Sequence, residues 1–218
     1  MEHRTLDVFR RALTASGLTA GEIVAVLSES TSRRALVEAA RLYAEVLRSE
    51  PRNFNALQLL GFLHFQKGQY QDAERLMDAA LGVNPNSLDA LYNRGCALLA
   101  LERPGEALAC FDRALALKPD LVPALLNRGN TLSQMGRFED AVLSYDNLIA
   151  LAPSSSDAYL NRGNALFELK RYAEALANYE RASSLEPRDP LVWSNRGNAL
   201  SELGRHQDAI ASFGKALA

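Results

Sequence analysis

The pattern of apolar and polar positions becomes regular from Phe54 onward. Apolar residues then recur every three to four positions in segments of about 13 residues, with a short polar turn between successive segments. This spacing places the apolar residues on one face of an amphipathic helix. Two such segments follow each other in every unit. Each unit is therefore predicted to fold as a pair of packed helices, here called A and B.

The helix pairs recur with a fixed period of 34 residues. The tripeptide Asn-Arg-Gly stands four times at this interval, and five prolines keep the same step: Pro51, Pro85, Pro119, Pro153 and Pro187. Proline cannot continue a helix, so each is expected to end a helix B. A fixed period of this length is typical of proteins built from stacked repeats. The sequence therefore predicts an all-α fold, an α-α superhelix (solenoid) of stacked helix hairpins.

Five regular repeats are predicted, of which the last is incomplete: 54–87, 88–121, 122–155, 156–189 and 190–218. The turn between helices A and B contains Gly68, Gly136 or Gly204 in three of them, and a left-handed glycine is expected to end helix A there. The turn of the second regular repeat is expected at Arg103-Pro104-Gly105, with Pro104 at the first position of helix B. Because the last repeat stops before its proline, we expect the natural chain either to continue or to have a short C-terminus.

Residues 1–53 depart from the regular pattern. Apolar spacing predicts an N-terminal helix up to about Thr14, a second helix that contains Ile23 and Leu27, and a third helix over residues 33–48. The last two helices would form a degenerate first repeat, residues 20–53. A divergent unit is expected at the end of a stack, because one of its faces has no neighbouring repeat to cover it.

The positions that the regular units share resemble the tetratricopeptide repeat. Counted from the first residue of each unit, position 8 is always glycine, position 20 is always alanine, and position 24 is phenylalanine, tyrosine or methionine. Small residues allow helices A and B to approach closely, and the large residue at position 24 is expected to fill the space between neighbouring pairs. The resemblance covers residues 54–218 and, more weakly, residues 20–53.

Composition narrows the classes of function. The net charge of −2 and the pI of about 6.0 provide no general attraction for the phosphates of nucleic acids or for anionic lipid. The sequence contains no signal peptide, no membrane-length apolar run, and no motif for a catalytic nucleophile or a bound phosphate. Cys96 and Cys110 are isolated and fit a reducing compartment. We expect a cytoplasmic protein that is not an enzyme, with no nucleic-acid or membrane partner, no metal and no cofactor.

A row of arginines occupies position 7 of four repeats, and an acidic residue stands 16 residues before each arginine, at position 25 of the preceding repeat. Helix B and the next helix A run antiparallel around a loop, so the two positions lie level with each other. We therefore expect ion pairs between adjacent repeats rather than a phosphate site. In the repeat that begins at Phe54, position 7 is Leu60 and its partner is Ala44, so both charges are absent together.

Asparagines form two further rows on helices A. Positions 6 and 9 are three residues apart and share one helical face, which stacking would repeat along the concave face of the solenoid. An asparagine side chain offers a donor and an acceptor, as a peptide bond does, so the rows are predicted to bind the main chain of an extended peptide. The candidate peptide-binding asparagines are Asn93, Asn127, Asn130, Asn161, Asn164, Asn195 and Asn198.

The repeat that begins at Phe54 has Leu59 and Phe62 in place of these asparagines. Its part of the surface is expected to be apolar, either as a pocket for a hydrophobic side chain of the peptide or as a packing surface for the N-terminal helix. Leu59 and Phe62 are therefore included among the candidate peptide-binding residues. The lysines of a carboxylate clamp, as found in chaperone-binding repeats, are missing from positions 2 and 5, so the rows are not expected to hold a C-terminal carboxylate.

The position-6 row also resembles the asparagine ladder in the repeat arms of O-linked N-acetylglucosamine transferases, with bacterial proteins of that type the most similar. The leading hypothesis is a protein-interaction scaffold that binds an extended peptide. The resemblance implies a second hypothesis, the substrate-recruiting arm of a larger glycosyltransferase. A third hypothesis is a homo-oligomer formed through exposed terminal helices near Ile210 and Phe213. A fourth interpretation is that the asparagines serve only local backbone groups or water.

Overall fold

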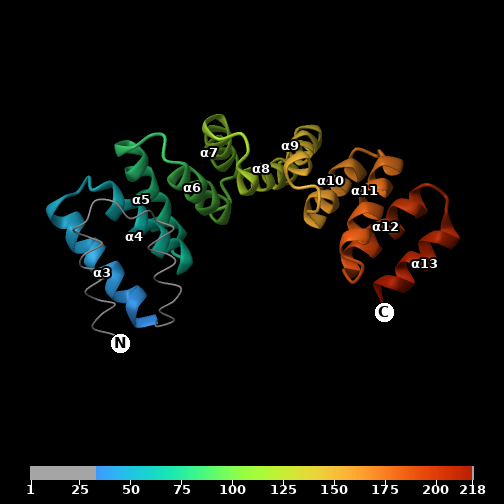
Figure 1. Cartoon of the computed structure of the whole chain (residues 1–218), viewed down its shortest axis with the longest axis horizontal. Coiled ribbons are helices and arrows are strands. Elements are labelled where there is room, and N and C mark those ends of the chain that lie inside the picture. Colours follow the sequence, from blue (N-terminus) through green and yellow to red (C-terminus); the bar gives the residue numbers. More distant parts are fainter. Residues whose placement is uncertain (1–32, 218) are drawn as a thin grey trace. The chain divides into compact units, whose positions relative to one another are not determined.

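The computed structural model describes residues 33–217, and every regular element in that range is an α-helix, with no β-strand among the described residues. The architecture is the predicted all-α solenoid of helix hairpins (Figure 1). The helices are α3 (Arg33–Ser49), α4 (Phe54–Gln66), α5 (Tyr70–Val83), α6 (Leu88–Ala100), α7 (Pro104–Leu117), α8 (Val122–Gln134), α9 (Phe138–Leu151), α10 (Ser156–Glu168), α11 (Tyr172–Leu185), α12 (Pro190–Glu202) and α13 (His206–Ala216). The two helices predicted within residues 1–32 lie outside the described residues.

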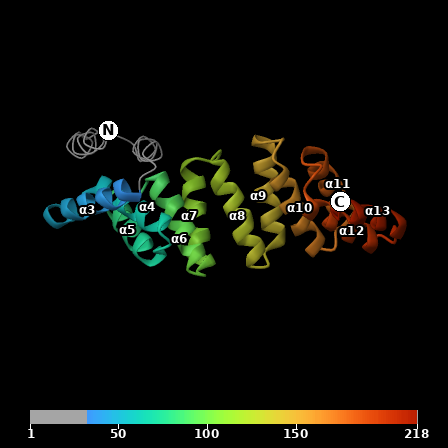
Figure 2. The ribbon, with the colours of Figure 1, turned by 90° about the horizontal axis from the view of Figure 1, so that it is seen from below.

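The chain divides into two compact units, Met1–Cys110 and Phe111–Ala218, and the boundary falls inside α7. In the first unit α3 packs on α4, which forms a hairpin with α5, and α6 packs on α5. In the second unit the hairpins α8–α9, α10–α11 and α12–α13 follow one another, and the second helix of each hairpin packs on the first helix of the next (Figures 1 and 2). Within this unit, therefore, α8, α10 and α12 correspond to helices A.

All five helices A begin at the predicted residues and contain 13 residues each. In four of them a polar side chain before the helix accepts a hydrogen bond from a backbone N–H of the first turn, which satisfies a donor that the helix itself leaves unpaired. The four capping residues are Asn53, Ser87, Ser155 and Asp189. Helix α8 has no such cap and instead carries Pro123 in its first turn, where the missing N–H of proline costs nothing.

The turn between helices A and B has a left-handed residue at position 15 in every repeat. Three are the predicted glycines, with φ near 73°, and the other two are Glu102 and Lys170, both with φ of 58°. The turn predicted at Arg103-Pro104-Gly105 is wrong by two residues: the turn lies at residues 101–103, where Glu102 adopts the left-handed conformation, and Gly105 lies inside α7. The expectation that Pro104 begins helix B is confirmed.

In the three hairpins of the second unit, the glycine at position 8 lies directly against the aromatic ring at position 24. A Cβ atom added to Gly129 would lie 2.5 Å from a ring carbon of Tyr145, and one added to Gly163 would lie 2.6 Å from Tyr179. Gly197 has the same relation to Phe213 at 2.5 Å. We expected the residue at position 24 to fill the space between pairs. The structure shows its contact with position 8 of its own hairpin, which is why that position cannot carry a side chain.

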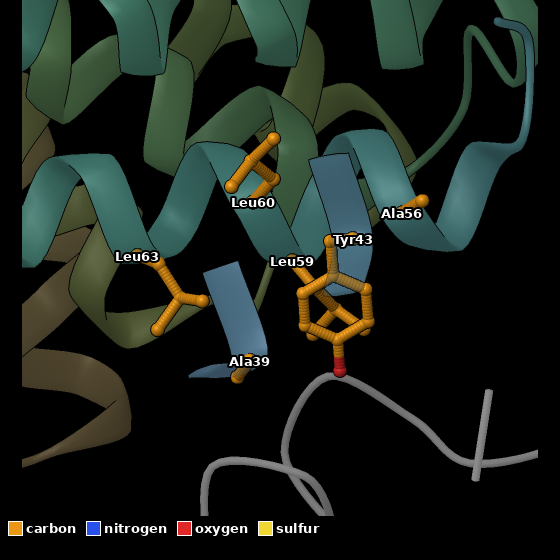
Figure 3. Packing of buried hydrophobic residues seen from close by; sticks show 6 residues of the cluster. All are labelled: Ala39, Tyr43, Ala56, Leu59, Leu60 and Leu63. Atoms are coloured by element: carbon orange, nitrogen blue, oxygen red, sulfur yellow. The ribbon is translucent and has the colours of Figure 1, made fainter. Parts of the chain in front are cut away.

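Helix α3 and helix α4 share a small apolar core (Figure 3). Its buried members are Ala39 and Tyr43 from α3 and Ala56, Leu59, Leu60 and Leu63 from α4. The predicted third helix is confirmed by α3, and Ala39 and Tyr43 lie on its buried face. Burial raises the pKa of Tyr43 to about 12. The apolar face of α3 thus packs against the first regular repeat.

Candidate functional site

The arginines at position 7 form the predicted ion pairs with the acidic residues 16 positions earlier. The N···O distances run from 2.6 Å for Arg128 and Asp112 to 3.1 Å for Arg196 and Glu180. The other two pairs are Arg94–Asp78 and Arg162–Asp146, at 3.0 and 2.7 Å. The arginine side chains are mostly buried and the carboxylates about half exposed. These guanidinium groups therefore connect adjacent repeats and are already neutralised within the fold.

Two of these arginines also donate a hydrogen bond to a serine of their own hairpin, which the sequence did not predict. Arg128 Nη1 donates to Ser144 Oγ, and Arg196 Nη1 donates to Ser212 Oγ at 2.6 Å. Where the arginine is replaced by Leu60, that side chain is buried in the α3–α4 core and Ala44 packs against the same core. The position that lacks both charges is therefore occupied by an apolar contact between α3 and α4.

The asparagines of the second unit are connected to one another by hydrogen bonds. Asn161 Nδ2 donates to Asn130 Oδ1 at 3.2 Å, and Tyr145 Oη donates to the same oxygen at 2.8 Å. One repeat later, Asn195 Nδ2 donates to Asn164 Oδ1 at 2.9 Å, and Tyr179 Oη donates to that oxygen at 3.0 Å. We call each set of one tyrosine and two asparagines an amide relay. Each relay joins position 9 of one repeat to position 6 of the next.

The contact between glycine and tyrosine explains why the relay forms. With no side chain at position 8, the ring of Tyr145 lies on the backbone of α8 at Gly129, and its hydroxyl reaches the neighbouring residue, Asn130. The same arrangement brings Tyr179 to Asn164 across Gly163. Burial raises the pKa of both tyrosines, so their hydroxyl groups stay protonated near neutral pH and can donate.

The relay gives each amide a fixed orientation. An amide oxygen has two lone pairs, and those of Asn130 are used by Tyr145 and Asn161. The Nδ2 of Asn130 makes no hydrogen bond among the described residues, and neither does the Oδ1 of Asn161. Asn130 is exposed and Asn161 half-buried. At each relay, position 9 therefore offers an N–H donor and position 6 an oxygen acceptor. The second relay repeats this with Asn164 and Asn195.

The remaining candidate asparagines do not take part in a relay. Asn198 is exposed and makes no hydrogen bond among the described residues, and its hairpin has Phe213, which lacks a hydroxyl group, in place of tyrosine. Asn127 lies half-buried on α8 in the position-6 row. Asn93 is half-buried on α6 and belongs to the first unit.

The apolar candidates of the first unit differ in accessibility. Leu59 is only 5% exposed and packs in the α3–α4 core with Tyr43, so it offers no accessible contact for a peptide (Figure 3). The predicted N-terminal helix, the other expected neighbour of this surface, lies outside the described residues. Phe62 is half-buried on α4. Of the two, Phe62 alone presents part of its side chain to solvent.

Two aromatic side chains of the α12–α13 hairpin make local contacts. Trp193 is half-buried, donates its Nε1 hydrogen to the carbonyl of Pro187 at 2.8 Å, and has the Lys215 ammonium 4.1 Å from its ring centre. Phe213, named with Ile210 as a candidate for self-association, packs against Gly197 within its own hairpin. Ile210 is 70% exposed, so it is the residue of that pair that lies open to solvent.

The tyrosine hydroxyls are functional candidates that sequence reasoning missed, because it treated position 24 only as a packing position. A signal was present in the sequence: the two repeats with tyrosine at position 24, Tyr145 and Tyr179, both have asparagine at position 9. Within the described residues there is no cluster of three or more potential metal ligands. None of the described helices has both the length and the apolar composition needed to cross a membrane.

Stacked hairpins of 34-residue period, three of them with glycine against an aromatic ring, define a helical repeat protein. The chain belongs to the tetratricopeptide repeat family. Family models described as "Tetratricopeptide repeat" match residues 37–73, 59–122, 126–182 and 191–218, and one described as "TPR repeat" matches residues 163–204. Family and fold together support a protein-interaction scaffold.

Solved structures of MamA share this fold. One crystal structure of MamA is 22% identical, with a TM-score of 0.73, and the match covers 75% of this chain and 90% of that chain. MamA from residue 41 to its end, from Desulfovibrio magneticus RS-1, is 21% identical, with a TM-score of 0.70, and the match covers 82% and 93% of the two chains. At these identities the likeness shows the fold alone. A comparison with curated proteins finds no match.

Proposed function

We propose that this protein is a noncatalytic scaffold that binds an extended polypeptide segment through the asparagines of α8, α10 and α12. The observation that supports this proposal is the orientation of the amides in the two relays. Each relay leaves one N–H donor and one oxygen acceptor without a partner among the described residues, and these are the groups that a peptide main chain complements.

The proposed recognition depends on several weak contacts rather than one strong contact. A hydrogen bond exposed to water contributes little by itself, because binding exchanges it for a hydrogen bond to water. Repetition compensates for this, since contacts on one linked ligand act together once the first has formed. Within the first unit, Asn93 and Phe62 are separate candidate contacts for a peptide. Leu59 is left out of the proposed surface because it is buried.

Two alternative roles carry over from the sequence. The substrate-recruiting arm of a glycosyltransferase would use the same asparagines and differ in the domain attached to the repeats. Self-association is favoured by a specific observation, the 70% exposure of Ile210 on α13. Both roles are compatible with a protein-interaction scaffold. A cytoplasmic location and a lack of affinity for nucleic acid stay part of the proposal.

The experiment begins with peptides selected from a random library on the wild-type protein. Their affinities are measured by fluorescence anisotropy for the wild type and for the triple variant Asn127→Ala, Asn161→Ala, Asn195→Ala. We expect the triple variant to bind about 100-fold more weakly or worse, and each single variant less than about tenfold more weakly. The matched control is Asn147→Ala, which replaces an exposed asparagine of a helix B, α9, and should leave the affinity unchanged.

Two outcomes would overturn the proposal. One is a set of peptides that bind the triple variant as tightly as the wild type, with circular dichroism showing the same helix content. The other is a library from which no peptide can be selected on the wild type.

A further inference from the structure

We infer that the two amide relays recognise the peptide main chain with a fixed polarity, and that Tyr145 and Tyr179 are the positioning residues that set it. This inference rests on the proposed function and specifies its ligand. The ligand is an extended segment that presents carbonyl oxygens to Asn130 and Asn164 and unsubstituted N–H groups to Asn161 and Asn195. A proline or another N-substituted residue would be rejected at the positions that face Asn161 and Asn195.

The polarity follows from which atom of each amide, oxygen or nitrogen, is already hydrogen-bonded within the protein. The oxygen of Asn130 receives two hydrogen bonds, from Tyr145 at 2.8 Å and from Asn161 at 3.2 Å, so its acceptor capacity is used. Only the amide nitrogen of Asn130 can then act toward a ligand, and a nitrogen donates. Asn161 uses a hydrogen of its own nitrogen in the relay, which leaves its oxygen to accept.

A reversed relay would need several groups to change their roles together. If Asn130 turned its nitrogen toward Asn161, two amide nitrogens would face each other, and both asparagines would have to turn together. The hydroxyl of Tyr145 would then have to accept rather than donate. In the structure the hydroxyls of Tyr145 and Tyr179 donate to the oxygens of Asn130 and Asn164, at 2.8 and 3.0 Å. These two hydrogen bonds hold the carbonyl orientation of both position-9 asparagines.

The two relays repeat the same order of donor and acceptor 34 residues apart in the chain, on the helices α8, α10 and α12. A peptide main chain likewise repeats its N–H and C=O groups at fixed intervals along an extended segment. One segment could therefore satisfy both relays. The side chains of the peptide would contribute little to this contact. The relays would therefore select an extended main chain with free N–H groups rather than a particular amino-acid sequence.

The first test replaces the donors without disturbing the relay. Asn130→Asp and Asn164→Asp keep an oxygen to accept from tyrosine and from the next asparagine but remove the N–H groups. We expect the double variant to bind a selected peptide of zero net charge about 10- to 100-fold more weakly than the wild type. The control is Asn147→Asp, which introduces one such charge on α9, where no relay lies, and should leave the affinity within about twofold.

The second test needs no protein variant. In the same peptide, each residue is replaced in turn by its N-methyl form, and separately by alanine. We expect N-methylation to weaken binding about tenfold or more at certain positions, at which alanine replacement has little effect. With Tyr145→Phe and Tyr179→Phe combined, the relays lose their fixed orientation, and the difference between sensitive and insensitive positions should shrink. A purely structural role of the tyrosines would lower affinity without changing this pattern.

The outcomes separate this inference from the proposed function. If the triple alanine variant loses binding while the double aspartate variant binds like the wild type, the asparagines bind the peptide and the inferred polarity is wrong. A uniform response to N-methylation along the whole peptide also overturns the inferred polarity. If neither variant weakens binding, the proposed function fails, and the inference fails with it.

Discussion

Glycine at position 8 and tyrosine at position 24 act as one unit in two of the repeats. The ring of Tyr179 occupies the space that a side chain at Gly163 would need, and its hydroxyl holds Asn164. The close packing of Tyr179 and the orientation of Asn164 therefore both depend on the lack of a side chain at Gly163. A change of one methyl group at this point is expected to affect both stability and binding.

Gly163→Ala should destabilise the protein and disturb the second relay. The added Cβ would lie 2.6 Å from a carbon of the Tyr179 ring, which is almost fully buried and cannot move away freely. Overpacking of this kind lowers the free energy of unfolding by about 1–3 kcal/mol. Urea denaturation followed by circular dichroism measures this change.

The control is Gly214→Ala in α13 of the same unit, where nothing lies within 4 Å of the added Cβ. Because alanine favours a helix over glycine, this variant should be neutral or more stable by up to about 1 kcal/mol. Equal effects of the two substitutions would contradict the close contact between Gly163 and Tyr179.

The pairing of arginines with acidic residues could be predicted from the sequence, whereas the hydrogen bonds of the amide relays could not. The pairing of Arg128 with Asp112 follows from the geometry of two antiparallel helices around a loop, because both residues stand at equal distances from that loop. The hydrogen bond from Tyr145 to Asn130 depends on how deeply the ring lies over Gly129. That depth is set by packing in three dimensions, and periodicity alone does not reveal it.

At the scale of helices, the first residues of helices A were predicted more accurately than the turns between helices A and B. Each helix A begins after a cap or at a proline, and these signals are local. The turn at Glu102 was misplaced because the expected glycine is absent from position 15, and Gly105 nearby gave a false signal. Lys170 also adopts a left-handed conformation without being glycine, since the fold of the hairpin imposes it.

The last helix, α13, differs from the equivalent helices of the same unit in how its outer face is covered. At position 21, Val142 of α9 and Leu176 of α11 are each 6% exposed, and both of these helices pack on a following helix A. Ile210 at the same position of α13 is 70% exposed. An equivalent apolar side chain is therefore buried in two helices and open in the third.

This contrast predicts unequal effects of truncation. Leu176→Ala should lower the free energy of unfolding by about 2–4 kcal/mol, because it leaves a cavity in a packed interface. Ile210→Ala should change it by less than about 0.5 kcal/mol. Urea denaturation of both variants measures the difference, and equal losses would contradict the contrast in burial.

Self-association through α13 makes a separate prediction. If the chain associates through this helix, its sedimentation should depend on concentration, and Ile210→Glu should abolish that dependence. Leu143→Glu on α9, where the side chain is also exposed, is the control. A wild type that sediments as a monomer at all concentrations would contradict self-association.

At the scale of the whole molecule, the 34-residue period predicts the solenoid, and the residues shared at positions 8, 20 and 24 predict its family. The period fixes which residues recur on equivalent faces, so the rows of arginine and asparagine could be identified from the sequence alone. Which members of a row are accessible could not be predicted, because this depends on the neighbouring helix. Leu59 illustrates the point: α3 covers it, while Phe62, three residues later on the same helix, is half-buried.

The most direct test of main-chain recognition observes the asparagine amides themselves. The side-chain N–H₂ signals of Asn130, Asn164 and Asn147 are followed by nuclear magnetic resonance while a selected peptide is added to saturation. We predict that the signals of Asn130 and Asn164 move downfield, as those of new hydrogen-bond donors do, while the signal of Asn147 on α9 stays in place. Saturable binding that leaves the signals of Asn130 and Asn164 unmoved would contradict the account.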